Sequence, residues 1–480
     1  MRVIAITLGV LAGLILLALL LLFIGGLRRS GWRVLRTRLR RSARIWRLAL
    51  RRVPRFLRLR RRGDQSELDA FHIETAGQVF ELLGGMKGAV MKLGQMVSIL
   101  GDNLPGPYRE VLRGLQASAP PMSYELAAGV VNAELGHEPE VLFRRFSREP
   151  IAAASIGQVH RADLDDGTPV AVKVQYPGVD VAISADLDNA FLLTNVAKMM
   201  APGMEPEPLI DELRARIGDE LDYRLEASNQ EEFRLAYEGH PFVRVPRVFP
   251  DYSARRVLTS EWVEGRSFYD LLEAPQDERD LVGEKLFRFW MGSVGTMRFF
   301  NADPHPGNYF FRPDGAIWFL DFGMVKRFGP AVIEGMVGQI RALRSGDPAR
   351  VREAMVAYGW FKPDVELDMD RVYELARFSQ EPLVEHQPFT FTTDYSRRVV
   401  EATMSIQGPY GDLIRHMTLP AEHMMLNRIQ LGVGALLGGL NATNNWAAIF
   451  DECLMDGPVA TDLGRQVEGW PRPLARLPQE

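Results

Sequence analysis

The order of apolar and polar residues divides the chain into an apolar start and a long mixed body. Val3 to Gly26 is a run of about 24 residues without a charge, enough to span a bilayer as a helix at about 1.5 Å per residue. After Gly63 the apolar positions recur at helical spacing, then partly with the alternation of strands, then at helical spacing again. This pattern predicts a transmembrane anchor over residues 1–27 and an α+β body.

The first part of the body, residues 67–124, is predicted to be a helical extension. Glu67 to Leu100 has apolar residues at helical spacing, yet four glycines lie between positions 84 and 94. Glycine disfavours an isolated helix, so these positions suggest that another backbone approaches closely. Gly88, Lys92 and Gln95 share one face, at i, i+4 and i+7.

Residues 125–264 are predicted to form a small β-rich lobe. A helix is expected at Tyr124–Leu135, and a longer one at Leu209–Ala236. Asp165-Asp166-Gly167 between two strand-like runs is a hairpin turn. The expected strands are Val141–Phe146, Gly157–Leu164, Pro169–Gln175, Val243–Phe249 and Arg255–Trp262.

Residues 265–463 are predicted to form a helical lobe, and residues 464–480 a Pro/Arg-containing tail. The glycines at 432 and 434 follow no strand, so helix packing explains them better than a dinucleotide-binding fingerprint. The expected helices are Asp280–Met297, Pro330–Arg344, Pro348–Tyr358, Met369–Phe378, Tyr395–Ser405 and Met424–Leu440.

The charge distribution changes the picture of the amino-terminal part. Residues 28–62 hold 16 arginines and no acidic residue, and the net charge of −4 therefore hides a body with 40 basic and 61 acidic residues beyond position 62. A dense positive block resists translocation, which favours a single-pass anchor in the cell membrane with the body on the cytoplasmic side. The alternative is a cleaved signal peptide, which would have a shorter apolar region and a small-residue cleavage site.

The Arg-rich juxtamembrane segment, residues 28–66, is interleaved with Trp32, Trp46 and Phe56. We expect it to lie on anionic phospholipid headgroups as an amphipathic helix. A stop-transfer block without a further role is the alternative, and a nucleic-acid-binding arm is the less favoured one; no nucleic-acid partner is predicted. The single cysteine, Cys453, excludes an intramolecular disulfide and a cysteine-cluster metal site.

The candidate chemistry centres on Phe299–Gly323, which reads FFNADPHPGNYFFRPDGAIWFLDFG. Asp303 is followed five residues later by Asn308, and a strand-like run then leads to the Asp-Phe-Gly that starts at Asp321. Phosphoryl transfer from ATP needs a carboxylate that orients the acceptor and oxygen ligands that hold Mg²⁺ against the phosphates. An Asp-x₄-Asn loop followed by DFG is the order of these parts in kinases, and the chain has no GxxxxGK[ST] loop.

Two further motifs occur in the order that a kinase requires. The strand ending Val170-Ala-Val-Lys173 matches the pattern whose lysine contacts the ATP phosphates and pairs with a helix acid. In the predicted 209–236 helix, Asp222 and Glu226 share a face and Glu220 points away, so Glu226 is the predicted partner of Lys173.

The nucleotide-covering loop and the hinge complete the predicted site. Ala152, Ala153, Ala154 and Ser155 stand where a kinase has glycines, and small side chains still permit close approach to phosphates. A buried helix start is an equally good local interpretation of this alanine run. Backbone atoms from Glu261 to Val263 are expected to meet the adenine edge.

Taken in order, Lys92-Leu-Gly-Gln95, the alanine loop, Val170–Lys173, Glu220–Glu226, ADPHPGN and DFG resemble the UbiB/AarF family of atypical kinases, relatives of ubiquinone-biosynthesis regulators. The resemblance covers roughly residues 70–440. It implies a bilobal protein-kinase-like fold with a small β-rich N-lobe, a helical C-lobe and an added helical KxGQ segment over the active site.

The resemblance also implies residue roles. Lys173 and Glu226 would form the ATP-orienting pair, Asn308 and Asp321 would bind Mg²⁺, and Asp303 would be the catalytic carboxylate. Lys92, with Gln95 of the same motif, would engage Glu220 and Asp222. The implied cofactors are ATP or ADP with Mg²⁺, and the implied partners are a membrane lipid or quinone precursor and proteins of a lipid-biosynthesis complex.

Two departures from the family pattern bear on function. Asn301 replaces the usual histidine two residues before the catalytic aspartate, which predicts weaker support of that loop. The predicted membrane segment is amino-terminal rather than carboxy-terminal, which leaves the quinone pathway open. We expect a membrane-anchored kinase or ATPase in isoprenoid-quinone or other membrane-lipid metabolism. A nucleotide-gated scaffold or pseudokinase is the alternative, and a membrane-surface adaptor with a vestigial kinase fold is the third.

Overall fold

The structure, a computed structural model, describes residues 122–470 except 155, 181–214, 216–217, 302–303, 406–407 and 419–420. The predicted anchor, the Arg-rich segment and nearly all of the predicted extension, including Lys92 and Gln95, lie outside the described residues, as do Ser155 and Asp303. In the described ranges, no helix is both long and apolar enough to cross a membrane.

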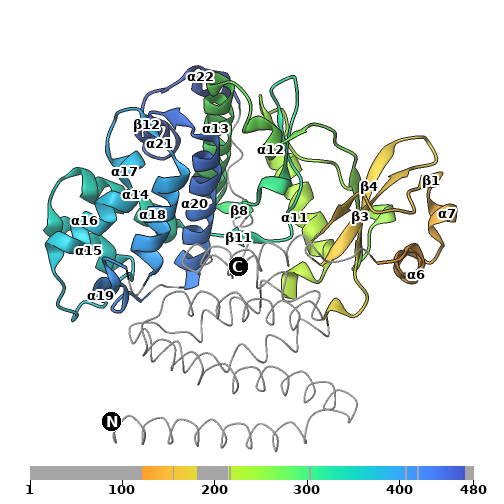
Figure 1. Ribbon diagram of the computed structural model, residues 1–480, viewed down its shortest axis with the longest axis horizontal. Coiled ribbons are helices and arrows are strands. Elements are labelled where there is room, and N and C mark those ends of the chain that lie inside the picture. Colours follow the sequence, from red (N-terminus) through yellow and green to blue (C-terminus); the bar gives the residue numbers. More distant parts are fainter. Residues whose placement is uncertain are drawn as a thin grey trace, which may run out of the picture. The chain divides into compact units, whose positions relative to one another are not determined.

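The first half of the described chain contains most of its strands (Figure 1). In order, the elements are α6 (Tyr124–Leu135), α7 (Pro139–Leu142), β1 (Arg145–Phe146), β2 (Ala152–Ala153), β3 (Gly157–Asp163), β4 (Pro169–Gln175), α11 (Tyr223–Ala236), β5 (Val243–Arg244), β6 (Val257–Glu261), β7 (Arg266–Ser267), α12 (Phe268–Leu271) and α13 (Gln276–Met291).

The second half carries four further strands and then mainly helices (Figure 1). After a π-helical turn at Gly292–Met297 come β8 (Phe299–Asn301), β9 (Tyr309–Phe311), β10 (Ile317–Phe319), β11 (Val325–Arg327), α14 (Pro330–Arg344), α15 (Pro348–Ala357), α16 (Met369–Ser379), α17 (Glu381–Val384), β12 (Phe389–Thr390), α18 (Thr393–Met404), α19 (Gly411–Ile414), α20 (Ala421–Leu440), β13 (Thr443–Asn444), α21 (Trp446–Leu454) and α22 (Asp462–Glu468).

The first sheet carries the predicted phosphate-contacting lysine. Its strand order in the described chain is β1-β3-β4-β6, with β2 added to β3, and all of the pairs are antiparallel. Val170, Val172 and Val174 of β4 are fully buried in a cluster that also contains Val131 of α6. Because side chains alternate along a strand, Lys173 between two of these valines points to the opposite face.

The predictions for α6 and β4 are confirmed to the residue, whereas two predicted strands are confirmed only over two residues each. Val141–Phe146 is strand only at Arg145–Phe146, because Pro139 starts the short helix α7 at a position where its missing N–H is not needed. Val243–Phe249 is strand only at Val243–Arg244, since Pro246 cannot donate a ladder hydrogen bond.

The fragment that remains, β5, joins a different sheet. In the described chain this sheet has the order β5-β10-β9-β7, and β5 pairs in parallel with β10 through Ile317 and Val243. The strand predicted for the first lobe therefore supports the segment that leads to Asp321.

The predicted helix Leu209–Ala236 is interrupted within its acid-bearing segment. Asp222 has extended backbone angles, φ −121° and ψ 97°, and its side chain accepts a hydrogen bond from Arg224 N. It is thus the N-cap of α11, a position that aspartate favours. Helical-wheel geometry does not carry across this cap, so the argument that Glu220 points away from Glu226 no longer applies.

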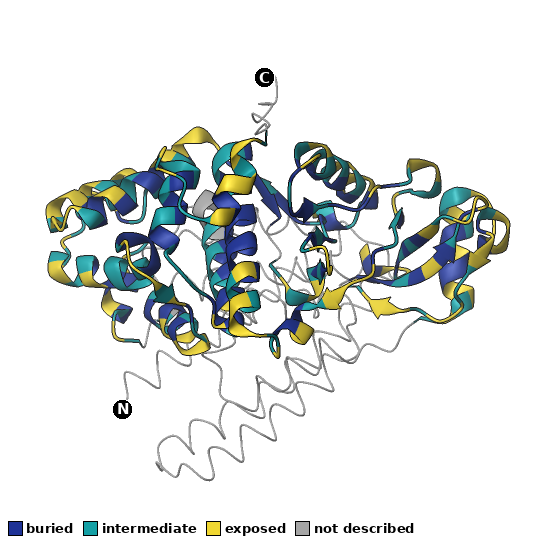
Figure 2. Ribbon diagram, turned by 90° about the horizontal axis from the view of Figure 1, so that it is seen from above, coloured by how far each residue is buried: buried dark blue, intermediate teal, exposed yellow. Residues whose placement is uncertain are grey.

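The main core joins α11, α13, strands β8 to β10, and helices α14, α20 and α21. Phe289 of α13 stacks on Phe319 of β10 with ring centroids 3.7 Å apart. Phe233 of α11 lies 4.4 Å from Phe299 and 4.8 Å from Phe322. Figure 2 shows buried residues on the inward faces of the helices and exposed ones on their outer turns.

The carboxy-terminal part of the described chain packs on this core. Helix α22 includes residue 464, where the tail was predicted to begin. Beyond this helix, Trp470 Nε1 donates a hydrogen bond to Glu238 O at 3.0 Å. The Trp470 ring also lies edge-on to His240, with centroids 4.6 Å apart. These contacts assign residues up to 470 to the folded body.

His240 makes the stability of this region depend on pH. Its Nδ1 accepts hydrogen bonds from the N–H groups of Phe242 and Val243, so it must be unprotonated. Burial, and then Arg244 and Arg288, lower the pKa of His240 from 6.5 to about 3. The unfolded chain therefore binds a proton below pH 6.5 that the folded chain does not, and stability falls as the pH drops from 6.5 towards 3.

Between pH 7.5 and pH 5, His240 should account for a loss of about 2 kcal/mol in unfolding free energy, at 1.36 kcal/mol per pKa unit. Urea unfolding of the wild type and His240→Asn at both pH values measures it. Asparagine can accept the same N–H groups without titrating, so the variant should lose about 2 kcal/mol less. Equal losses in the two proteins would contradict the assignment.

Candidate active site

Lys173 is held between two carboxylates from distant parts of the chain. Its Nζ lies 2.8 Å from Glu226 Oε1, 3.0 Å from Glu226 Oε2 and 3.4 Å from Asp321 Oδ2. Glu226 comes from the first turn of α11, and Asp321 follows β10. The pairing expected between Lys173 and Glu226 is thus present.

The solvent exposure of these side chains decreases from Asp321 to Glu226. The exposed fractions are 28% for Asp321, 15% for Lys173 and 3% for Glu226. Burial of Glu226 is compatible with a structural orienting role, and the partial exposure of Asp321 leaves it accessible to a ligand. Lys173 is thus fixed by the buried Glu226 on one side and faces the more accessible Asp321 on the other.

Tyr223 forms one side of the lysine environment. Lys173 Nζ lies 5.0 Å from the centroid of its ring, within the range of a cation–π contact, and Tyr223 is 1% exposed. The sequence analysis missed this residue. The sequence signal that could have identified it is the position of this aromatic residue between Asp222 and Glu226.

Electrostatics differ between the partners of this cluster. Burial opposes the charge of Lys173, but Asp321 and Glu226 together raise the pKa of Lys173 above its usual value. Burial raises the pKa of Glu226 to about 7, against the lowering effect of Lys173. Glu220 adds to this rise, so it acts on Glu226 across the break before α11.

Two asparagine amides hold the backbone of the DFG segment. Asn301 Nδ2 donates to Asp321 O, and Asn229 Nδ2 of α11 donates to Phe322 O at 3.2 Å. Asn301, which stands where the family pattern has histidine, is 5% exposed, and its amide contacts the DFG backbone. Phe322 is fully buried against Phe233 of α11, which links the helix of Glu226 to Asp321.

The candidate metal ligands Asn308 and Asp321 are brought together by the β9–β10 pairing. Leu320 N donates to Asn308 O at 3.0 Å, directly before Asp321. One amide and one carboxylate side chain therefore start from adjacent backbone positions. Oxygen donors of this kind suit Mg²⁺, which commonly takes one or two protein ligands and completes its shell with water and phosphate oxygens.

The alanine run is a strand and hairpin rather than a buried helix start. Ala152 and Ala153 form β2, pair with Val159 and Gln158 of β3, and are exposed. Ala154 N donates to Gly157 O at 2.9 Å and closes the turn. Because the two β2 side chains are exposed, core packing does not explain their small size.

Gly157, at the start of β3, allows this hairpin to approach the lysine strand closely. An added Cβ at this position would lie 2.3 Å from Val174 O and 3.0 Å from the Tyr223 hydroxyl oxygen. Only glycine fits so close a backbone contact. The hairpin is thereby joined to the strand of Lys173 and to Tyr223.

The predicted hinge follows β6, and two of its N–H groups are already used. Glu261 N donates to Arg247 O at 2.8 Å, and Trp262 N donates to Pro169 O at 3.2 Å. Contact with an adenine edge would therefore involve other backbone atoms of Glu261–Val263. Val263 itself is buried.

The remaining predicted acids occupy different environments. Glu220 is 6% exposed, while Asp222 caps α11 and bonds the guanidinium of Arg224 at 2.6 and 2.9 Å. The structure therefore does not place Asp222 on the Lys173-facing side of the helix. The predicted contact of both acids with Lys92 concerns a residue outside the described ranges and stays a prediction.

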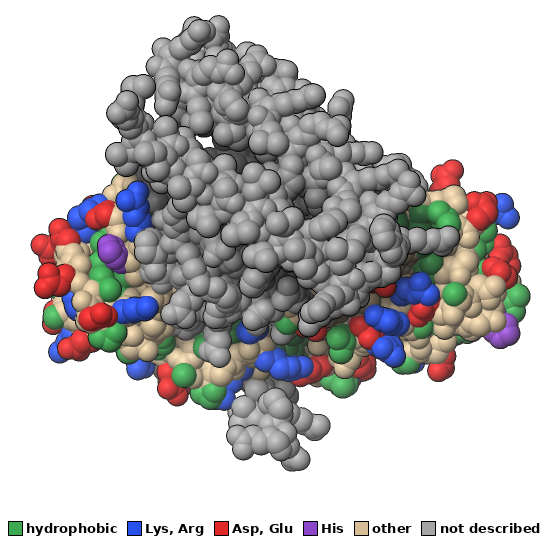
Figure 3. Space-filling view, turned by 90° about the horizontal axis from the view of Figure 1, so that it is seen from below, with side chains coloured by type: hydrophobic (Ala, Val, Ile, Leu, Met, Phe, Trp, Pro, Cys, Tyr) green, Lys and Arg blue, Asp and Glu red, His purple; other side chains and the backbone are tan. Residues whose placement is uncertain are grey.

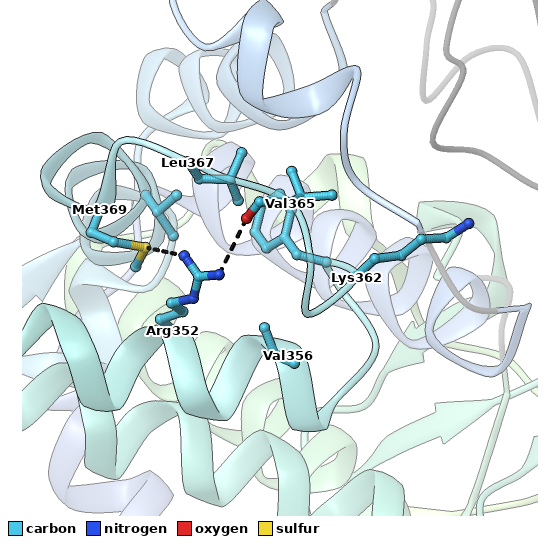
Figure 4. Close-up of a pocket in the computed structure, with 8 residues that line it drawn as sticks. Arg352, Val356, Lys362, Val365, Leu367 and Met369 are labelled. Carbon is cyan, nitrogen blue, oxygen red and sulfur yellow. Dashed lines mark hydrogen bonds between the residues drawn. The ribbon is translucent and has the colours of Figure 1, made fainter.

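A small apolar pocket lies elsewhere, among the carboxy-terminal helices (Figure 4). It is lined by Val356 of α15, Met369 of α16 and the loop between them. Arg352 in its wall donates to Pro363 O and Val365 O, both at 3.2 Å. These contacts use the guanidinium to fasten the loop, and the Lys173 cluster does not line this pocket.

Residues 114–355 match the model of the ABC1 atypical kinase-like domain. The chain belongs to this ABC1 atypical kinase-like family. The recognition of UbiB/AarF atypical kinases from sequence motifs is thereby confirmed, and the fold is a kinase-like ABC1 fold of mixed α and β content.

Among its relatives is the mitochondrial atypical kinase coq-8 of Caenorhabditis elegans, 29% identical over 386 residues, which cover 78% of this chain and 50% of that protein. The chloroplastic ACTIVITY OF BC1 COMPLEX KINASE 3 of Arabidopsis thaliana is 36% identical over 286 residues, 58% of this chain and 40% of that protein. The chain thus spans half of the length of the first of these two relatives and 40% of the second.

A solved structure from Mycobacterium tuberculosis, described as a complex of Rv3197 with erythromycin, is similar in fold and sequence. It has a TM-score of 0.59 and 33% identity, and the alignment covers 81% of this chain and 98% of the other. The chain is therefore similar to this structure in both sequence and fold.

Proposed function

We propose that this ABC1-family chain is a membrane-anchored atypical kinase or ATPase that binds Mg-ATP in a kinase-like site. The observation that carries the proposal is the position of Lys173 Nζ, 2.8 Å from Glu226 and 3.4 Å from Asp321. These three side chains come from a strand, a helix and a loop that are far apart in sequence. Their convergence is the arrangement that protein kinases use to hold Mg-ATP for phosphoryl transfer.

In this proposal, each group has a distinct task. Glu226 holds Lys173, whose ammonium group contacts the α- and β-phosphates, while Asp321 and Asn308 supply oxygen ligands for Mg²⁺. The metal would neutralise charge on the transferred phosphate. Asp303 orients the acceptor hydroxyl or water.

The backbone supplies the rest of the nucleotide site. The hairpin Ala152–Ala154, with Ser155, covers the phosphates, and backbone atoms of Glu261–Val263 meet the adenine edge. Lys92 and Gln95 of the KxGQ segment would cover the acceptor side and engage Glu220 and Asp222. This closure would restrict access by peptides.

We further propose that the acceptor or regulated molecule is a membrane lipid or isoprenoid-quinone precursor, handled with protein partners of a lipid-biosynthesis complex. The family resemblance and the uncharged run before the Arg-rich segment support this. On the face in Figure 3, side chains of both charge signs are interspersed over the described surface. We expect attraction to anionic headgroups to come from the 16 arginines of residues 28–62.

The proposal is tested with the full chain in lipid nanodiscs. Wild type should hydrolyse ATP in an Mg²⁺-dependent manner, and Mg-ATP should raise its melting temperature. Asp321→Asn should lower the hydrolysis rate tenfold or more, because it replaces the carboxylate ligand.

The outcomes separate the two candidate functions. Equal background hydrolysis by wild type and Asp321→Asn would exclude the enzyme. If Mg-ATP still raised the melting temperature, the nucleotide-gated scaffold would remain; without that shift, nucleotide binding itself would be excluded.

A further inference from the structure

Helix α20 contacts the loop that follows the proposed catalytic aspartate. At Gly432, an added Cβ would lie 2.1 Å from Pro304 Cγ, 3.1 Å from Pro304 Cβ and 3.4 Å from Pro304 Cδ. Real Cβ atoms do not approach carbon this closely, since packed carbons sit about 3.5–4.0 Å apart. Glycine at 432 therefore sets how close Pro304 lies to the helix.

The same helix contains a second glycine without this constraint. At Gly434, two residues further on, an added Cβ would meet its nearest atom, Phe391 Cε1, at 4.0 Å. Both glycines lie inside a helix, where alanine is favoured by about 1 kcal/mol. Position 434 could thus accept alanine, whereas position 432 could not do so without movement.

Helix α20 is not free to make that movement, because it is fastened to α18 and α13. Ser396 Oγ of α18 donates to Gly434 O at 2.9 Å. A Cβ at Gly438 would lie 2.8 Å from Thr392 O, and a Cβ at Gly283 of α13 would lie 2.5 Å from Ala442 Cβ, just beyond α20. Close contacts on two sides leave the helix little room to shift, so the loop must move instead.

Movement of Pro304 would be passed on to its neighbours. The proline nitrogen is bonded to the carbonyl carbon of Asp303, and the ring fixes φ and cannot rotate away as a flexible side chain can. On the other side, Asn308 N donates to His305 O at 3.0 Å, and Asn308 O accepts from Leu320 N. The segment from Pro304 to Asn308 therefore contacts α20 at one end and the residue after β10 at the other.

The geometry points to Gly432 of α20 as a positioning residue for Asp303, acting through Pro304. This inference rests on the proposed function, in which Asp303 orients the phosphoryl acceptor. Helix packing alone then does not explain Gly432, because this glycine sets the position of the loop that starts at Pro304. Misplacement of a catalytic group by about 1 Å can lower a rate about 100-fold.

The test compares Gly432→Ala with the matched control Gly434→Ala in the full chain. Gly432→Ala should lower kcat for ATP hydrolysis about 10- to 100-fold, with KM for ATP and the Mg-ATP melting shift close to those of the control. A general packing defect would instead lower melting temperature and nucleotide affinity together. A kcat within twofold of the Gly434→Ala value, or loss of nucleotide affinity alone, would overturn the inference.

Two further measurements hold even if Gly432→Ala is unstable or the wild type is inactive. Pro304→Ala removes the ring atoms nearest to position 432, so Gly432→Ala should reduce the melting temperature less in that background than in wild type. Crystal structures of the two glycine variants should show Pro304 displaced in Gly432→Ala alone. An unmoved Pro304, or an equal melting loss in both backgrounds, would refute the inference, whereas absent hydrolysis by wild type would refute the proposed function.

Discussion

Replacing Lys173 by Met should reduce kcat/KM for ATP by about 100- to 1000-fold, the range found when one preorganised charge-stabilising donor is removed. Lys173 Nζ is the cation between Glu226, at 2.8 Å, and Asp321, at 3.4 Å. Methionine keeps much of the length and apolar volume of the lysine side chain but removes its charge. The two acids would then face each other without a cation, and the phosphates would lose their contact.

Lys285 provides a matched control, because it is also a largely buried lysine. It is 6% exposed, and its Nζ donates to Gly315 O at 2.7 Å. Lys285→Met should lower the melting temperature but leave the melting shift caused by Mg-ATP intact. Steady-state ATP hydrolysis and the melting shift caused by Mg-ATP are measured on both variants. Similar kcat/KM values for the two variants would show that Lys173 has only a structural role.

Replacing Arg288 by Met should lower the unfolding free energy by about 3–5 kcal/mol, the usual effect of breaking a buried ion pair. The guanidinium of Arg288 binds both oxygens of Glu452 at 2.8 Å and Glu284 at 2.7 Å. All three residues are less than 9% exposed. The network joins α13 to α21, and Thr461 before α22 also contacts it, so its loss leaves two buried carboxylates uncompensated.

Two comparisons make this stability prediction specific. The triple variant Arg288→Met/Glu284→Met/Glu452→Met should recover most of the loss, because apolar groups then replace the whole network. Arg327→Met, which breaks an exposed pair with Glu232, should change stability by less than about 1 kcal/mol. Urea unfolding measures all three, and a loss for Arg288→Met no larger than that for Arg327→Met would contradict the buried-network account.

Local sequence signals, such as helix caps and the alternation of apolar residues, correctly predicted α6 and β4. The N-cap at Ser123 and the glycine at 136 bound α6 where the pattern predicts it, and the alternation in Pro169–Gln175 predicts β4. The pairing of Lys173 with Glu226 was also expected, although through an incorrect helical wheel.

Errors arose where one residue overrode a longer pattern. Pro246 limited a predicted strand to Val243–Arg244, and Asp222 capped α11 inside a predicted continuous helix. Both signals were present in the sequence, but they competed with apolar runs that fitted longer elements. The assignment of β5 to the sheet of β10 had no local signal, because strand pairing depends on contacts between residues far apart in sequence.

By itself, the sequence determined the family, the order of the kinase-like motifs and the residues able to supply a cation, carboxylates and an amide at the site. Chemistry of this kind is encoded in residue type and short spacing. Only the tertiary structure decided that Asn229 and Asn301 hold the DFG backbone, that Tyr223 lies beside Lys173, and that Gly432 meets Pro304. These contacts join segments up to 128 residues apart, and the packing of the folded chain, rather than any local pattern, sets which of them form.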